Sequence, residues 1–427
     1  MRTHLSPSAL RLPDAAEAER ILRSCVHCGF CNATCPTYQQ LGNELDGPRG
    51  RIYLIKTFLE EDKAGPATRA HLDRCLSCRN CETTCPSGVD YHRLLDIGRE
   101  ALDQQQSRPI KQRALRLGLR TLVPRAWLFT PLATGATRMR RWLPAALADH
   151  LPRRIAASGH WPAPRHPRRM LALSGCVQPG LSPNTNAAAA RLLDRLDISL
   201  EPAAGCCGAI DFHLDAQRQG LDRARRNIDA WWPAIERGVE AILVSASGCG
   251  AFVKEYGKLL ARDPDYADKA LRVSQLARDP VEVFGDAPLE RLGQPHSPPR
   301  LAVHSPCTLT HAQRLGGALD ALLKRLGFEL SPVADGHLCC GSAGSYSITQ
   351  PALSKRLRDE RMRALEQGAP ALIVTANIGC QTHLDSAGRT PVRHWLEVVD
   401  EAFAIPAPPQ TPSPHSLSPT QGETHAH

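Results

Sequence analysis

The sequence predicts a multidomain protein in which an α-helical N-terminal domain is followed by two duplicated α/β domains. Three observations lead to this fold class. The sixteen cysteines fall into four groups of four. Helical periodicity dominates around the first two groups, whereas short apolar runs alternate with amphipathic segments after residue 170. The last two groups repeat one pattern at offsets of 131 to 133 residues, which an internal duplication explains.

Composition limits the class of protein. The 427 residues carry a formal net charge of +9, and 42% of them are apolar, enough for packed cores. No apolar run approaches the ~20 residues of a membrane-spanning helix, and the N-terminal residues lack the apolar stretch of a secretory signal. We therefore expect a cytoplasmic protein, in which thiols stay reduced. Cysteines in that compartment indicate metal or redox chemistry rather than disulfide bonds.

The helical domain is expected over residues 10–107. Both of its cysteine groups read C-x2-C-x2-C-x3-C-P, with Pro36 and Pro86 closing two copies that are 50 residues apart. The segments AAEAERILRSC, GRIYLIKTFLEED and YHRLLDIGREALDQQ lie before, between and after the copies. Their apolar residues recur at helical spacing, which predicts a helix for each segment.

The spacing of these cysteines is typical of [4Fe–4S] clusters. Three cysteines at i, i+3 and i+6 can wrap one face of a cubane, and in two-cluster ferredoxins the fourth cysteine of each run ligates the other cluster. A pair of zinc sites is the alternative, but zinc ribbons usually use paired C-x2-C knuckles. The sequence predicts a two-cluster ferredoxin-like domain, with expected ligands Cys25, Cys28, Cys31 and Cys85 for one cluster, and Cys75, Cys78, Cys81 and Cys35 for the other.

The two α/β domains are expected over residues 170–263 and 300–403, with a linker over 264–299. A cysteine closes each of the runs RMLALSGC, VEAILVSASGC, RLAVHSPC and APALIVTANIGC, just after an expected strand. The carboxyl ends of parallel strands are where such sheets place their sites. A Cys-Cys-Gly sequence completes each group, so the first CCG group is Cys176, Cys206, Cys207 and Cys249, and the second CCG group is Cys307, Cys339, Cys340 and Cys380.

The chemistry of the two CCG groups stays open at this stage. The alternatives are an iron–sulfur cluster, redox-active thiols, a structural zinc ion and free buried thiols. Duplication of all four cysteines argues against free thiols, and each group has enough cysteines for one cubane. His304 and His311 flank Cys307 and are candidates for proton transfer or for binding a quinone head group. Their other interpretation is as ordinary exposed polar residues.

Residues 108–169 form a basic, Pro- and Arg-rich connector. They contain fourteen Lys and Arg against one acid, Asp149, so the rest of the chain is mildly acidic. Trp and Leu interleave with Arg in LVPRAWLFTPL and MRRWLPAAL, as in interfacial segments. We expect this connector to contact a partner or the cytoplasmic face of the inner membrane rather than to be a passive linker. Nucleic acid is not expected, because no nucleic-acid-binding fold accompanies the charge. The Pro-rich tail over 405–427 is predicted to be disordered.

Three stretches closely resemble the family of iron–sulfur subunits of bacterial glycolate oxidase: CVHCGFCNATCPTYQQLGNELDGPRGRIYLIK, CLSCRNCETTCPSGVDYHRLLDIGR and SGCVQPGLSPNTNAAAARLLDRL. The resemblance implies a subunit of an oxidoreductase complex that oxidises glycolate, a 2-hydroxy acid, to glyoxylate. FAD-containing partner subunits would perform the oxidation, and this chain would pass electrons to the respiratory chain, with quinone as the expected acceptor. The resemblance therefore implies that no catalytic residue lies on this chain, and the lack of a visible G-x-G-x-x-G dinucleotide fingerprint is consistent with this.

Two alternatives share parts of this pattern. The iron–sulfur subunit of anaerobic glycerol-3-phosphate dehydrogenase has the same architecture. A CCG domain would instead reduce a disulfide or a quinone itself if it worked like the heterodisulfide reductases, which it also resembles. In those proteins the motif ends in C-x-x-C, whereas Ala246 and Asn377 replace the first cysteine of that closing pair here. Their unusual cluster is therefore not carried over.

Overall fold

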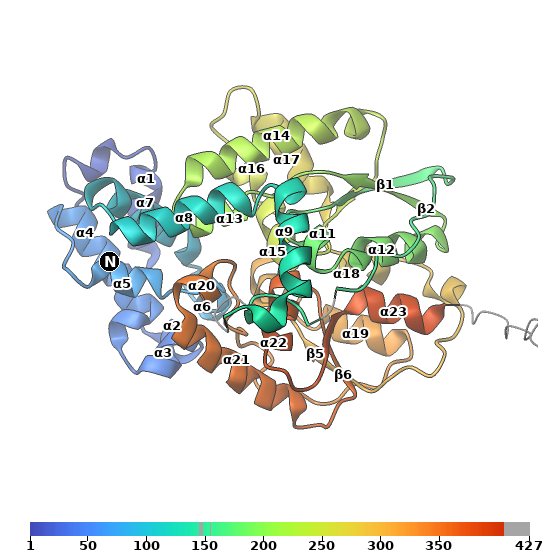
Figure 1. Ribbon diagram of the computed structural model, residues 1–427. Helices are drawn as coiled ribbons and strands as arrows, with labels where there is room; N and C mark the ends of the chain where they lie inside the picture. Colours follow the sequence, from blue (N-terminus) through green and yellow to red (C-terminus); the bar gives the residue numbers. More distant parts are fainter. Residues whose placement is uncertain (145–147, 154, 405–427) are drawn as a thin grey trace, which may run out of the picture.

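The computed structural model describes residues 1–144, 148–153 and 155–404. In Figure 1 the N-terminal helices (blue) form one lobe, and the two α/β units (green to yellow, and orange to red) lie beside it. The predicted disordered tail over 405–427 lies outside the described residues.

The N-terminal lobe is helical, as expected, and its core forms between two long helices, α4 (Pro48–Glu61) and α7 (Tyr91–Gln105). Their contact is close: a Cβ atom on Gly98 would lie 2.8 Å from Cγ1 of Ile55, so only glycine fits there. The remaining helices of the lobe are short and carry the cysteine loops between them: α1 (Ala15–Ser24), α2 (Phe30–Ala33), α3 (Pro36–Leu41), α5 (Thr68–Asp73) and α6 (Asn80–Thr84).

The first α/β unit contains a four-stranded parallel sheet of order β2-β1-β3-β4. Its strands are β1 (Arg168–Leu173), β2 (Ile198–Ala203), β3 (Ala241–Leu243) and β4 (Ala277–Arg278). Its helices are α11 (Gln178–Leu181), α12 (Asn184–Asp194), α13 (Ala209–His213), α14 (Gln217–Glu236), α15 (Ser247–Lys254), α16 (Tyr256–Leu259), α17 (Ala267–Leu276) and α18 (Pro280–Gly285).

The expected linker over residues 264–299 is wrong. This stretch forms α17, β4 and α18, and β4 pairs with β3 as the fourth strand of the first sheet. The strand has only two residues, and a pair this short carries no periodicity that a sequence pattern can reveal.

The second α/β unit repeats this topology. Its parallel sheet has the order β5-β6-β7, with β5 (Leu301–His304), β6 (Leu372–Thr375) and β7 (Val392–His394). A single parallel bridge between Leu301 and Leu330 stands at the position of β2 in the first sheet. The remaining elements are a π-helical turn η5 (Thr308–Ala312), α19 (Ala318–Arg325), α20 (Tyr346–Thr349), α21 (Pro351–Glu366), α22 (Ile378–Asp385) and α23 (Trp395–Phe403).

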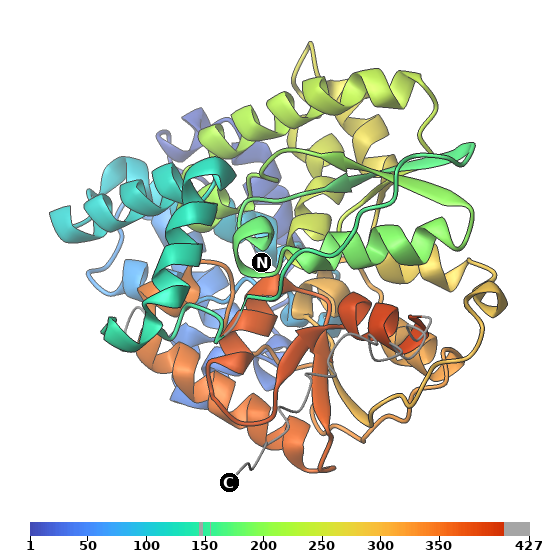
Figure 2. The ribbon, with the colours of Figure 1, turned by 45° about the vertical axis from the view of Figure 1, so that its right-hand side comes forward.

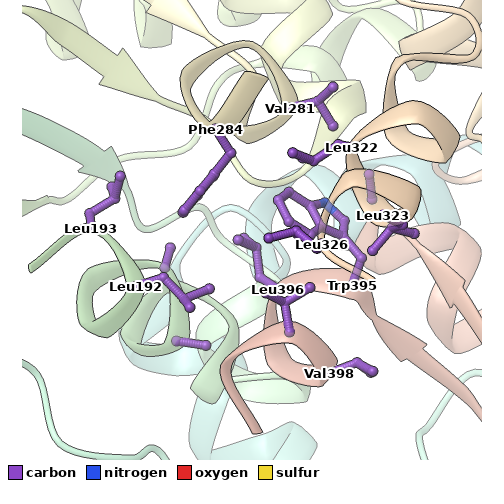
Figure 3. Close-up of a cluster of buried hydrophobic side chains, with 14 of the residues drawn as sticks. Leu192, Leu193, Val281, Phe284, Leu322, Leu323, Leu326, Trp395, Leu396 and Val398 are labelled. Carbon is purple, nitrogen blue, oxygen red and sulfur yellow. The ribbon is translucent and has the colours of Figure 1, made fainter. Parts of the chain in front are cut away.

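The two α/β units form one body, because they share their largest core. Helix α12 of the first unit packs against α23 of the second, and α18 of the first packs against α19 of the second. Figure 3 shows side chains from all four helices meeting, with Phe284 and Trp395 among them. These two rings form an edge-to-face pair with centroids 5.7 Å apart. The duplicated units are therefore fixed relative to each other.

The basic connector is packed rather than extended. It contains α8 (Ile110–Leu122) and α9 (Ala126–Arg138), the teal helices at the left-hand side of the view in Figure 2. Helix α9 packs on α11 through Phe129 and Ala133, beside Leu181. The outer side chains of the connector remain open: Trp127 on α9 and Trp142, which follows that helix, are about three-quarters exposed. In the described part of the chain, no helix is long and apolar enough to cross a membrane.

Candidate iron–sulfur sites

The two cysteine loops of the N-terminal lobe have the same backbone conformation. His27 and Gly29 in the first loop have positive φ angles of 61° and 88°, and Ser77 and Arg79 at the matched positions have 51° and 61°. Side-chain-bearing residues rarely adopt this left-handed conformation. The matched pairs turn each C-x2-C-x2-C segment back on itself, so that its cysteines face one cavity.

The first cavity contains the four thiols expected to hold one cluster. It is lined by Cys25, Cys28 and Cys31 from the first loop and by Cys81 and Cys85 from the second, around about 430 Å³ of empty space that is partly open to solvent. Cys25 is buried, whereas Cys28 is exposed. This cavity therefore lies near the protein surface.

The second cavity contains the other expected set. It is lined by Cys35, Cys75, Cys78 and Cys81 around about 360 Å³ of empty space that is partly open to solvent. Pro48, Cys81 and Tyr91 line both cavities, so the two sites are direct neighbours. The hydroxyl of Tyr91 donates a hydrogen bond to Sγ of Cys75 over 3.5 Å. Electron tunnelling falls steeply with distance, so neighbouring cavities suit two redox centres in series.

Burial governs the acidity of these thiols. It raises the pKa of Cys31 to about 11, with the charge on Cys25 as the second cause. It raises the pKa of Cys78 and Cys81 well above the usual range. A cationic iron–sulfide core would offset both burial and the repulsion between neighbouring thiolates, because it supplies opposite charge to the thiolates that bind it. Four convergent thiols around one cavity are thus the donor set that a [4Fe–4S] cluster requires.

The second CCG group lies beside the second cavity. Cys78, which lines that cavity, packs with Cys307 and Cys339 in one small cluster that also contains Tyr346 and Leu357. The Sγ atoms of Cys307 and Cys339 are 3.9 Å apart. No comparable contact joins the first CCG group to the ferredoxin cysteines among the described clusters.

Polar side chains face the second CCG group. A ring nitrogen of His304 and the Sγ atoms of Cys340 and Cys380 lie within 4.8 Å of one another, and all three residues are buried. Arg361 Nε on α21 donates a hydrogen bond to Nδ1 of His304 over 3.2 Å. Asn377 Nδ2 donates to Sγ of Cys380 over 3.4 Å. Burial lowers the pKa of His304 well below its usual value, so the ring is neutral.

His311 has a different environment from the one expected. It is buried, and its Nδ1 accepts a hydrogen bond from the Thr83 hydroxyl over 2.9 Å, while Nε2 donates to the carbonyl of His337 over 3.0 Å. Asn80 donates to the same carbonyl over 3.3 Å. These bonds join α6 of the N-terminal lobe to the second α/β unit. Both ring nitrogens are occupied, so His311 fixes the position of the lobe.

The first CCG group has apolar surroundings. Cys207 belongs to a core that includes Phe212 and Ile228. The carbonyl of Cys206 accepts a hydrogen bond from Asn227 over 2.8 Å, and that of Cys207 accepts one from Tyr256 over 2.6 Å. These two polar side chains therefore hold the backbone of this CCG sequence, while the N–H of Gly208 hydrogen-bonds to the Cys206 sulfur and the charge of Arg223 acts on it.

Sequence reasoning missed Arg361 and Arg108. Arg361 lies in the highly charged helix sequence KRLRDERMRALE, where nothing in the spacing sets it apart from its exposed neighbours. Arg108, at the start of the connector, joins the N-terminal lobe to the first α/β unit: it pairs with Asp73 and also with Asp215. Only the fold brings these charges together.

Comparisons with known proteins agree with this arrangement. Residues 21–89 match the family model of the 4Fe-4S dicluster domain, and residues 170–254 and 301–385 match that of the cysteine-rich domain CCG. The chain is 60% identical over 405 residues to the "Glycolate oxidase iron-sulfur subunit" of Escherichia coli (strain K12), covering 94% of this chain and 99% of that protein. The chain belongs to the family of glycolate oxidase iron–sulfur subunits.

More distant relatives match with lower identity. The "Probable glycolate oxidase iron-sulfur subunit" of Bacillus subtilis (strain 168) is 30% identical over 84% of this chain and 87% of its own length. The "Lactate utilization protein A" of Bacillus licheniformis is 26% identical over 48% of this chain and 85% of its own length. The family resemblance and the expectation of two [4Fe–4S] clusters are confirmed. The two alternative functions are not favoured.

Proposed function

We propose that this chain is the electron-transfer subunit of a glycolate oxidase, carrying electrons from FAD-containing partner subunits toward a respiratory acceptor. The observation that carries the proposal is the pair of adjacent thiol-lined cavities in a chain that is 60% identical to a glycolate oxidase subunit over almost its whole length. The chain conducts electrons, and the oxidation of glycolate takes place on the partners.

The ligand sets follow the two cavities. Cys25, Cys28, Cys31 and Cys85 hold one cluster, and Cys35, Cys75, Cys78 and Cys81 hold the other. The shared wall of the two cavities supports this cross-ligation, since each set combines cysteines of both loops. When bound, the clusters supply one-electron redox chemistry. The protein contributes fixed thiolates, exclusion of water and hydrogen bonds such as that from Tyr91 to Cys75.

Electrons enter at the first cavity. Cys28 is exposed, and Val26 and Phe30 beside it are more than 60% exposed, with Tyr53 about half exposed. Exposed apolar side chains around a redox site are typical of a docking surface for a partner protein. The flavin-containing subunits bind at this surface, which brings the flavin within tunnelling range of the first cluster.

The connector provides a second contact surface. Exposed Ile110, Leu117, Trp127 and Trp142 alternate there with arginines. Basic and aromatic side chains in this combination suit the surface of an anionic membrane, where polybasic segments gain about 1 kcal/mol per charge. The complex thus meets the quinone pool on the cytoplasmic face of the inner membrane.

Glycolate-dependent reduction of a quinone analogue by the purified complex tests the proposal. Cys28→Ser should abolish this activity, and a dye that takes electrons directly from the flavin should restore glycolate oxidation. Phe30→Ser should weaken binding of the flavin subunits, whereas Leu271→Ser, an exposed apolar residue of α17, should not. Quinone reduction that survives the loss of the first cluster would refute the proposed route.

A further inference from the structure

We propose that the two CCG groups have diverged, and that only the second holds an iron–sulfur centre, in series with the cluster of the second cavity. His304 and Arg361 are positioning residues that donate hydrogen bonds to the sulfur atoms of this centre. The first CCG group is structural. The inference concerns metal content and redox order, so it does not depend on glycolate being the substrate.

The two CCG groups differ in how well their surroundings can stabilise a buried negative charge. An iron–sulfur centre bound by thiolates is anionic, and burying an anion is costly unless donors or cations face it. The second group has such donors on several sides. The N–H of Gly341 donates to Sγ of Cys339 over 3.4 Å, and Asn377 donates to Sγ of Cys380 over 3.4 Å. Both of these N–H groups donate to the sulfur atoms that would bind the centre.

Two further donors beside the second group lack a partner. His304 is fully buried, and its Nε2 makes no hydrogen bond within the described residues. Arg361 is 3% exposed, and its Nη2 likewise has no partner there. Leaving a buried donor unpaired costs about 1–3 kcal/mol, and more when it is charged. Both atoms find acceptors in the sulfur atoms of a bound anionic centre.

The hydrogen bond from Arg361 decides the role of His304. Arginine can only donate, so Nδ1 of His304 must accept, and the proton of the neutral ring is on Nε2. A histidine that binds a metal through Nε2 normally donates its other nitrogen's proton to a carboxylate or carbonyl, which is the opposite arrangement. His304 therefore faces the centre as an N–H donor, and the thiols of the group are the ligands.

The first group has fewer such donors. The backbone N–H of Gly208 hydrogen-bonds to Cys206, as that of Gly341 does to Cys339, and the charge of Arg223 acts on the Cys206 sulfur. The positions of His304 and Asn377, however, carry no polar side chain in the first unit. Leu173 ends β1 where His304 ends β5, and Ala246 precedes α15 where Asn377 precedes α22. Helix α14 matches α21, and there Asn227 donates to a backbone carbonyl instead of reaching sulfur. An anionic centre at the first group would therefore have less compensation for its lost hydration than one at the second group.

Position favours the second group as well. Cys78, a proposed ligand in the second cavity, belongs to the same side-chain cluster as Cys307 and Cys339, and its charge interacts with theirs. An electron from the cluster of the second cavity therefore has a short path to the second CCG group. In this step one electron leaves one cluster and enters the other, and no bond or proton is exchanged.

Iron counting on anaerobically prepared full-length protein tests the inference. The wild-type chain should contain about twelve irons, four for each of three centres. The double variant Cys339→Ser/Cys340→Ser should retain about eight irons and the spectroscopic signals of both ferredoxin clusters, which also shows that it folds. The matched double variant Cys206→Ser/Cys207→Ser should retain about twelve.

Other results would overturn the inference. About eight irons in the wild type would mean that neither CCG group holds a centre. Equal iron loss in both double variants would mean that the two groups have not diverged. Stoichiometric zinc that disappears with Cys339→Ser/Cys340→Ser would mean that the second group binds zinc. The variant His304→Leu, which introduces the residue of the first unit, should keep its iron. In this variant the reduction potential of the third centre should be more negative than in the wild type, because hydrogen bonds to sulfur favour the reduced state and one of them has been removed. Electron paramagnetic resonance during a dithionite titration measures this potential. An unchanged potential would refute the role given to His304.

Discussion

The ion-pair network around Arg108 allows a sharp test of how the N-terminal lobe is held. Arg108 is almost fully buried and forms two hydrogen bonds with Asp73 of the lobe, 2.7 and 3.0 Å long. It also donates to Asp215 of the first α/β unit over 2.6 Å. Asp215 is 1% exposed and has one further partner, Arg116, at 2.7 Å. Replacing Arg108 therefore removes a partner from buried carboxylates.

The magnitude follows from the burial. Removing one partner of a buried ion pair costs about 3–5 kcal/mol. Because Arg116 still holds Asp215, we expect Arg108→Ala to cost about 3 kcal/mol, the lower end of that range. Arg168 provides the matched control: it pairs with Glu240 through three hydrogen bonds, but both side chains are more than one-third exposed. Arg168→Ala should cost under about 1 kcal/mol.

Urea unfolding followed by circular dichroism measures both variants. The first transition, in which the lobe separates, should move to lower urea for Arg108→Ala and stay nearly unchanged for Arg168→Ala. Iron content should remain that of the wild type, because neither residue lines a thiol cavity. Equal and small shifts in the two variants would refute the argument that burial makes this network important.

Two further predictions concern the α/β units. Burial raises the pKa of Asp279 to about 7 from 3.8, so the folded state keeps a proton that the unfolded chain loses. The free energy of unfolding should therefore fall as the pH rises from about 4 to about 7 and then level off. Asp279→Asn should flatten this pH profile, and the same profile in the variant and the wild type would contradict the role given to Asp279. Phe284→Ala should destabilise the contact between the units by about 3–5 kcal/mol in urea unfolding, because the ring is fully buried against Trp395. Exposed Leu271→Ala is its control, and a similar small cost for both would count against the shared core.

The local chemistry was readable from the sequence because it depends on close spacing. Cys25, Cys28 and Cys31 lie within seven residues, and their spacing alone predicts that they face one side of a cubane. The cavity that adds Cys85 has the composition that cross-ligation requires. The α/β pattern was equally readable at β1, β3, β5 and β6, each of which carries a run of at least three apolar residues. It failed at β4, whose two residues belong to the sheet only through their pairing with β3.

The sequence by itself determined the kinds of site in this protein: four cysteine groups, two of them in a spacing specific for iron–sulfur clusters, and a duplication of the other two. Only the tertiary structure decided how they are connected. It places Cys78 beside Cys307 and Cys339, although more than 200 residues separate them. It also turns His304 toward the sulfurs while His311 becomes a bond between lobes. Burial and long-range packing set these outcomes, and neither leaves a periodic trace along the chain.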